Sequence, residues 1–343
     1  MGAQTRPLPL ARGPLSVVPD AKPVRLTRFG GGGFRSDLLA FGLRHTVKPF
    51  IGVWSHVPLL PWPYFLADYA GLALKPVEGT TFERIDLPHC KAELLRTPST
   101  EDRVVVYLHG GAFVVGGRFL HRQLMSRIAE RTRATVVAVE YRQLPKHPVS
   151  TSIADALDAY RHVLDSGVPA SKVVVMGDSA GGYLTFQLAL AAQEAGLPMP
   201  AGLVAMSPLI DFDGTVKVAA PSAESCALFP SHCFRGLGQV VMRASLRAGE
   251  AVVLPGAPSQ AALHGLPPSL IQASSAEMVF PDAVSMAEAL SAADVDVELQ
   301  VWDHQVHVFQ AAAGVLPEAD QALEEIADFV DTVAPDQLWA LEA

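Results

Sequence analysis

The stretch KVVVMGDSAGG, residues 172–182, decides the fold. After Lys172, residues 173–176 form the continuous apolar run that is typical of a strand buried in a parallel sheet. The motif G-x-S-x-G follows at 177–181, and a helical pattern begins directly after Ser179 and extends to Glu194. Strand, tight turn and helix are the context in which this motif presents a nucleophilic serine. We therefore predict that Ser179 is a nucleophile at the edge of a parallel sheet.

The glycines of this turn have a steric role. Cβ atoms at the flanking positions would not fit so tight a turn, and the nucleophile itself is expected in strained backbone. The Ser179 hydroxyl would then project above the sheet, beside the positive end of the following helix. An ordinary glycine-rich turn is the alternative, and the strand and helix around the motif argue against it.

Strand and helix patterns alternate along the chain on both sides of this stretch. This alternation predicts an α/β fold with a mostly parallel central sheet that helices cover on both faces. Strands are expected at 83–87, 104–108, 135–140, 172–176, 203–207, 269–273 and 297–302, and helices at 122–132, 152–164, 180–194, 282–292 and 317–333.

Two segments fall outside the alternation and predict a helical cap. Residues 1–35 look irregular, whereas 36–73 have helical apolar spacing that prolines interrupt. Residues 211–264 contain no clear strand and are rich in Pro, Gly and Ser. We therefore expect four parts: an N-terminal cap segment at 1–75, the first part of the core at 76–210, an inserted cap segment at 211–264 and the second part of the core at 265–343.

Aromatic residues are frequent in the N-terminal cap segment. The interpretation that we favour is a packed helical flap. The alternative is that these side chains line an acyl pocket or touch a lipid surface. The residues concerned are Trp54, Trp62, Tyr64, Phe65 and Tyr69.

A second glycine motif, HGGAF at 109–113, follows the predicted strand 104–108. Its backbone N–H groups at Gly110, Gly111 and Ala112, together with that of Ala180, are candidates for an oxyanion hole. Such donors stabilise the negative charge that develops in the transition state of acyl transfer. A plain strand-to-helix turn is the alternative, which the Ser179 motif further along the chain makes less favoured.

The general base and its acid partner should follow Ser179 in the order acid and then histidine. His264, His304 and His307 come late enough, and we favour His307, which follows the last predicted strand, over its neighbour His304. The acid should follow the strand 269–273, where Glu277 and Asp282 both qualify. Asp282 could instead cap the helix that starts near residue 283.

The overall composition limits the classes of partner. With 343 residues, half of them hydrophobic, the chain can bury a large core, and its net charge of −9 argues against binding to nucleic acid. No metal-ligand spacing and no G-x-G-x-x-G after the first strand occurs, so we expect neither a metal nor a cofactor.

The location of the protein is also an expectation from composition. The three cysteines, Cys90, Cys226 and Cys233, do not resemble a disulfide framework, although the last two could pair. The N-terminus does not resemble a secretory signal, and no apolar run is long enough to cross a membrane. We therefore expect a cytoplasmic protein without a transmembrane segment, and a homodimer stays open.

Five motifs together resemble the hormone-sensitive-lipase family of bacterial esterases, within the α/β hydrolases. They are HGGAF at 109–113, YRQLPKHP at 141–148, GDSAGG at 177–182, SPLID at 207–211 and VHVF at 306–309. The resemblance covers about residues 75–335. It implies the α/β-hydrolase fold, with Ser179 as nucleophile and His307 as base.

The chain departs from this family's pattern at two places. The family's acid is usually an aspartate about 30 residues before the histidine; Glu277 stands at that place here, which keeps Asp282 open. The family's His-Gly-Gly-Gly becomes HGGAF, and we expect Ala112 to be acceptable only with a negative φ.

The resemblance implies a serine carboxylesterase that hydrolyses short- to medium-chain esters through an acyl-enzyme intermediate. The ligand would be a small-molecule ester. An acyltransferase that uses the same residues is an alternative. A non-catalytic receptor is another, because the plant gibberellin receptor resembles this family but lacks the histidine that His307 provides here.

Overall fold

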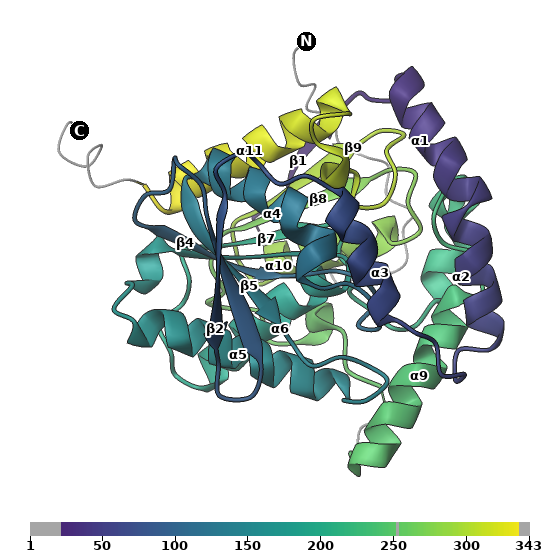
Figure 1. Ribbon diagram of the computed structural model, residues 1–343, viewed down its shortest axis with the longest axis horizontal. Coiled ribbons are helices and arrows are strands. Elements are labelled where there is room, and N and C mark those ends of the chain that lie inside the picture. The colour runs from purple at the N-terminus through teal and green to yellow at the C-terminus, as the bar shows by residue number, and fades with distance from the viewer. Residues whose placement is uncertain (1–21, 252–253, 336–343) are drawn as a thin grey trace.

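The strand that precedes Ser179 lies near the centre of a single nine-stranded sheet in this computed structural model, which describes residues 22–251 and 254–335 (Figure 1). The strand order is β1-β9-β8-β7-β6-β4-β5-β3-β2. The strands are β1 (Arg25–Phe29), β2 (Thr81–Asp86), β3 (Lys91–Arg96), β4 (Arg103–Leu108), β5 (Ala134–Glu140), β6 (Val173–Asp178), β7 (Gly202–Met206), β8 (Ser269–Ser274) and β9 (Val297–Trp302).

The sheet is parallel from β1 to β5, and only β3 pairs antiparallel with its two neighbours. Every residue of β4, β6 and β7 is buried, because helices cover both faces of the sheet. The predicted mostly parallel, two-side-covered α/β architecture is confirmed.

Side chains of β4 alternate between two hydrophobic clusters, one on each face of the sheet. Val104, Val106 and Leu108 belong to the cluster that contains helices α5 (Val149–Asp165), α6 (Ala180–Glu194) and α10 (Phe280–Ala292). Val105 and Tyr107 belong to the cluster of α4 (Arg118–Thr132) and α11 (Pro317–Val333). Figure 1 shows α4 and α11 on one side of the sheet and α5 and α6 on the other.

The remaining helices come from the two segments that interrupt the alternation. They are α1 (Phe34–His45), α2 (Val47–His56), α3 (Phe65–Ala70), α7 (Thr215–Ala219), α8 (Pro221–Ser225) and α9 (Cys233–Ala248). Short 3₁₀ turns lie at Gly71–Ala73, Ala170–Lys172, Pro258–Gln260 and Phe309–Ala312. Helices α1, α2 and α9 lie along one side of the molecule, with α2 packed on α9 (Figure 1).

None of the helices in the described residues combines the length and the hydrophobicity that crossing a membrane requires. Within 211–264, the described residues contain helices and no strand. The division into cap and core at 1–75, 76–210, 211–264 and 265–343 stays a prediction.

Two strands were not predicted from the sequence. The expectation of irregular structure over 1–35 is wrong at β1, which pairs with β9 in parallel, and the Phe29 ring stacks on Trp302 with centroids 4.0 Å apart. The strand β3 was missed because charged residues interrupt its apolar pattern. One of them, Glu93, is buried and accepts hydrogen bonds from Arg122, with Nε to Oε2 at 2.8 Å.

Helix α6 approaches β4 so closely that residue 181 has no room for a side chain. A Cβ atom on Gly181 would overlap the carbonyl oxygen of Leu108, which belongs to the backbone and cannot rotate away. We expect Gly181→Ala to lower the free energy of unfolding in urea by about 3 kcal/mol. Gly238→Ala on α9 is the matched control: no described atom lies within 4 Å of its added Cβ, so it should be neutral or slightly stabilising. Equal stability of the two variants would contradict this packing.

Candidate active site

Ser179 lies between β6 and α6 in a backbone conformation that is strained for a residue with a side chain. Its φ is 52° and its ψ is −116°. The strain is held by hydrogen bonds on both sides: the Ser179 N–H donates to Met206 O at 2.9 Å, and the Ser179 carbonyl accepts from Leu209 N at 3.0 Å. Buried neighbours on β7 and the loop after it therefore fix the turn that carries the hydroxyl.

His307 contacts the hydroxyl of Ser179 directly. Its Nε2 lies 2.9 Å from Ser179 Oγ, and the imidazole is largely buried. The loop after β9 holds the ring in place, since the following residue, Val308, donates its N–H to Ser207 Oγ at 3.1 Å. The ring of Phe229 packs edge-on against the imidazole at a centroid distance of 4.8 Å.

The carboxylate of Glu277 completes a continuous hydrogen-bonded relay. Its Oε2 lies 2.6 Å from His307 Nδ1, and its Oε1 accepts the N–H of Ser274 at 2.8 Å. The side chain is completely buried at the end of β8. One oxygen thus orients the imidazole while the other anchors the carboxylate to the backbone.

Asp282, the other candidate acid, lies in a different environment. Lys217 Nζ is 2.9 Å from its Oδ1, and its Oδ2 accepts the N–H groups of Ile210 at 2.7 Å and Asp211 at 3.1 Å. Burial raises the pKa of this carboxyl, although Lys217 acts in the opposite direction. The expected capping role is wrong, because helix α10 starts at Phe280 with Val279 as its N-cap and Asp282 lies inside the first turn.

In the described residues, neither of the two other late histidines has a hydrogen bond to Ser179. The backbone nitrogen of His304 lies 3.4 Å from Ser275 Oγ. Its side chain lies close to Gly32, because a Cβ atom added to that glycine would be 3.0 Å from the Cβ of His304. The backbone carbonyl of His264 accepts a hydrogen bond from Gln193 at 2.7 Å.

The HGGAF loop differs from the sequence-based expectation in two respects. The Gly110 N–H donates to Asp178 Oδ1 at 3.0 Å and is therefore occupied. The expectation of a negative φ at Ala112 is wrong: φ is 53° there and 61° at Phe113. A residue with a side chain adopts a positive φ only at a cost in conformational free energy. The packing of the buried Phe113 side chain offsets this cost. The N–H groups of Gly111, Ala112 and Ala180 have no acceptor in the described part of the chain.

Asp178, the residue before Ser179, contacts both loops of the candidate site. Besides Gly110, it accepts a hydrogen bond from Tyr107 Oη at 2.7 Å, and its Oδ2 lies 3.6 Å from His121 Nε2. Burial raises the pKa of Asp178, but His121 and the hydrogen bonds outweigh it, so the net shift is downward. Burial likewise lowers the pKa of His121, and the carboxylate reverses this to a net increase. Each of the two groups thus favours the charged form of the other.

His109 is buried beside His121, with ring centroids 5.1 Å apart. Its ring stacks on Tyr141 with centroids 4.4 Å apart, and Tyr141 Oη donates to His109 O at 2.7 Å. Burial, reinforced by the positive charge of His121, lowers the pKa of His109 to about 4. His109 is therefore neutral at pH 7 and braces the loop.

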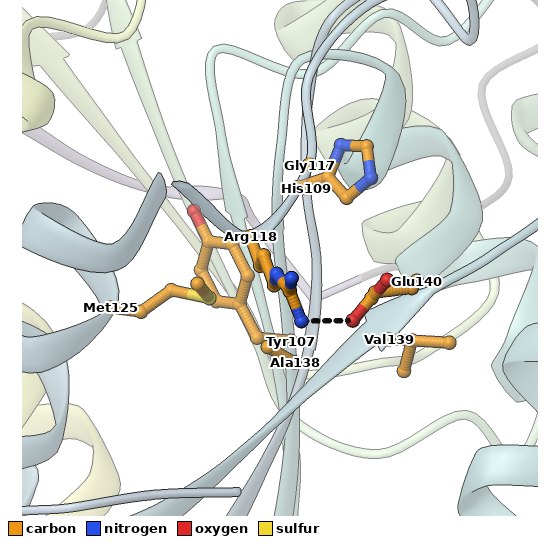
Figure 2. A pocket seen from close by; sticks show the side chains of 8 residues that line it. All are labelled: Tyr107, His109, Gly117, Arg118, Met125, Ala138, Val139 and Glu140. Carbon is orange, nitrogen blue, oxygen red and sulfur yellow. Dashed lines mark ion pairs between the residues drawn. The ribbon is translucent and has the colours of Figure 1, made fainter. Parts of the chain in front are cut away.

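A small cavity lies behind the HGGAF loop, next to the ion pair of Arg118 and Glu140 (Figure 2). Its volume of about 10 Å³ is close to what one water molecule needs. The lining residues are Tyr107, His109, Gly117, Arg118, Met125, Ala138, Val139 and Glu140. Because it is so small and does not include Ser179, this cavity is not a substrate site.

No grouping of three or more His, Cys, Asp or Glu side chains that could hold a metal ion occurs in 22–251 or 254–335. The structure thus brings together Ser179, Glu277 and His307, and it directs Asp282 to Lys217. Sequence reasoning missed Lys217 and His121, because a single lysine or histidine carries no pattern. It also missed Phe229, which packs on the imidazole from a segment without a recognisable motif.

Comparison with known proteins shows relatives along most of the chain. A family model described as α/β-hydrolase fold matches residues 105–311. Esterase LipU of Mycobacterium tuberculosis is 37% identical over 292 residues, which are 83% of this chain and 98% of the relative. Carboxylesterase/phospholipase LipF of the same organism is 34% identical over 328 residues, 92% and 86% of the two chains.

Solved esterase structures superpose on the same region. EstE5, in a crystal soaked with p-nitrophenyl butyrate, has a TM-score of 0.77 at 28% identity and covers 89% of this chain and 100% of its own. An esterase from the bacterial hormone-sensitive lipase family has a TM-score of 0.73 at 30% identity, covering 83% of this chain and 97% of its own.

The two carboxylates can be separated by their different effects. We expect Glu277→Gln to lower kcat about a thousandfold or more with little change in unfolding, because the amide cannot stabilise a charged imidazole. Asp282→Asn should keep kcat within about tenfold but lower the unfolding free energy by about 3 kcal/mol, since Lys217 would keep a buried, unpaired charge. Steady-state kinetics and urea unfolding of both variants make the comparison. The opposite ranking of kcat would assign the acid to Asp282.

The lowered pKa of His109 predicts a stability change in acid. Between pH 6.5 and about pH 4, the unfolded chain binds a proton at His109 that the folded protein does not bind. The free energy of unfolding therefore falls as the pH falls through this window, by about 3 kcal/mol from this residue. His109→Gln should remove this part, so urea unfolding should show a larger loss of unfolding free energy between pH 6.5 and pH 4.5 for the wild type than for the variant. An identical pH dependence of both proteins would contradict the shift.

Proposed function

Because the chain belongs to the α/β-hydrolase-fold family and is a serine carboxylesterase, we propose that Ser179, His307 and Glu277 are its catalytic triad. The resemblance to hormone-sensitive-lipase-family esterases that the motifs indicated is confirmed. The observation that carries the proposal is the unbroken relay of hydrogen bonds, 2.9 Å from Ser179 to His307 and 2.6 Å from His307 to Glu277.

This relay can move one proton in each half of the reaction. His307 Nε2 takes the hydroxyl proton as Ser179 Oγ attacks the ester carbonyl, and the protonated imidazole then gives that proton to the leaving alcohol. Water repeats the sequence on the acyl-enzyme and releases the acid. The buried Glu277 carboxylate stabilises the imidazolium in both steps and keeps Nδ1 protonated.

We propose that the N–H groups of Gly111, Ala112 and Ala180 hold the oxyanion. Ala180 supports this role because it starts helix α6, where the helix dipole favours a negative charge. Gly110, which was also a candidate from the sequence, takes a positioning role here, since its N–H is bound to Asp178. The loop conformation of Gly111 and Ala112 leaves their N–H groups without an acceptor among residues 22–251 and 254–335.

The substrates that we propose are short- to medium-chain, uncharged carboxylic esters. The Phe229 ring against His307 gives the relay an apolar neighbour, which favours an uncharged acyl or alcohol group. A cytoplasmic location and a homodimer stay predictions. The free state of Cys90, Cys226 and Cys233 supports the reducing compartment.

A panel of p-nitrophenyl esters from acetate to octanoate tests the proposal. We expect Ser179→Ala to lower kcat by a factor of about 10⁴ or more on every ester and to abolish labelling by a fluorophosphonate probe. Ser231→Ala, a change at an exposed serine, is the matched control and should behave as wild type. Retention of most activity by Ser179→Ala would exclude Ser179 as the nucleophile.

A further inference from the structure

Helix α1 exposes large apolar side chains on the face that does not pack on the core. Phe34, Leu38 and Phe41 recur at the spacing of one helix face and are 80%, 59% and 61% exposed. On the other face, Leu39 and Leu43 pack against the hydrophobic core. A surface helix of a water-soluble domain normally has a polar outer face, so an apolar one needs a partner.

Helix α2 repeats this arrangement. Its residues Val47, Phe50 and Val53 point outward, and Phe50 and Val53 are both 60% exposed. The inward face carries Ile51 and the buried Trp54, which pack on the core. The helix is therefore apolar around most of its circumference although only one side is covered.

The apolar surface continues into the segment after α2. The ring of Trp62 lies edge-on to Phe50, with centroids 5.7 Å apart. Further exposed apolar side chains follow at Val57, Leu59, Leu60, Phe65, Leu66, Tyr69, Leu72 and Leu74. We call the exposed surface of α1, α2, α9 and residues 57–74 the cap face.

The charge on these helices is opposite to that of the whole protein. The chain has a net charge of −9, yet α1, α2 and α9 together carry six arginines and lysines against a single carboxylate, Asp37. On α9, exposed Met242 and Leu246 alternate with arginines. The cations are Arg35, Arg44, Lys48, Arg235, Arg243 and Arg247.

The cap face is connected to the catalytic histidine by a short path. Arg44 and Lys48 donate to the carbonyls of Ser225 and Cys226, at 3.0 and 2.6 Å. The same segment continues to Phe229, which packs on His307. A partner that binds the cap face would therefore lie next to the segment that packs on the hydrogen-bonded relay of Ser179, His307 and Glu277.

We propose that the cap face binds the surface of an anionic phospholipid bilayer. Exposed aromatic and aliphatic side chains enter the boundary between headgroups and acyl chains, and the surrounding arginines and lysines attract anionic lipids. A second copy of the chain fits this face less well, because a symmetric contact would bring the same cations together. The inference goes beyond ester hydrolysis and does not depend on which ester is cleaved.

Sedimentation with vesicles tests the proposal, using the full chain with Ser179→Ala so that lipids stay intact. We expect binding to vesicles of phosphatidylcholine mixed with phosphatidylglycerol in equal parts, and much weaker binding to phosphatidylcholine alone. The double variant Phe41→Ser, Phe50→Ser should bind about tenfold or more weakly, as should Arg243→Glu with Arg247→Glu. Hydrolysis of p-nitrophenyl acetate by the same variants, with Ser179 restored, should stay close to wild type and shows that they fold.

Two matched controls lie away from the cap face. Phe82→Ser removes an exposed aromatic ring from β2, and Arg161→Glu reverses an exposed charge on α5. Both should bind vesicles as the parent does. Binding that is equal on neutral and anionic vesicles, or equally weakened by the controls, would overturn the proposal. So would a dimer by light scattering that the Phe41 and Phe50 changes dissociate and that binds no vesicles, because the occupant would then be a second copy.

Discussion

The buried carboxylate of Asp178 connects the two loops on which the site depends. It is the last residue of β6 and precedes Ser179, and it accepts a hydrogen bond from the N–H of Gly110 in the loop after β4. A Cβ atom at residue 110 would overlap this carboxylate, so only glycine permits the contact. His121, whose Nε2 lies 3.6 Å from Asp178 Oδ2, favours the charged form of Asp178 in the interior, where an unpaired charge would be costly. This side chain therefore helps to fix the HGGAF loop relative to Ser179.

Those features of the fold and site that depend on local sequence could be predicted. Short-range patterns include the apolar run before Ser179, the two glycine motifs and the position of His307 after the last strand. Most strands and helices of the core could be predicted from patterns of the same kind. Strand β1 could not be predicted, because its residues pair with residues of β9 that lie 273 positions later, as in Arg25 with Glu298.

The choice between Glu277 and Asp282 is another case that depends on distant residues. Both follow β8 at suitable spacing, and what separates them is Lys217, which reaches Asp282 from helix α7. The positive φ of Ala112 likewise depends on how the loop packs, so the loop's own amino-acid sequence does not predict it. In each case a contact between segments far apart in sequence overrides a local preference. The Lys217 to Asp282 pair also links the inserted segment to the helix that follows β8.

Strand β1 has a consequence for how copies of this protein meet. It covers the side of β9 that would otherwise offer free N–H and C=O groups, and so takes the place that a strand from another chain would need. β1 itself is only five residues long and carries Arg25 and Arg28. Short, charged border strands discourage extension of a sheet from one molecule into the next. The nine-stranded sheet is thereby protected at this border against growth into an intermolecular β-structure.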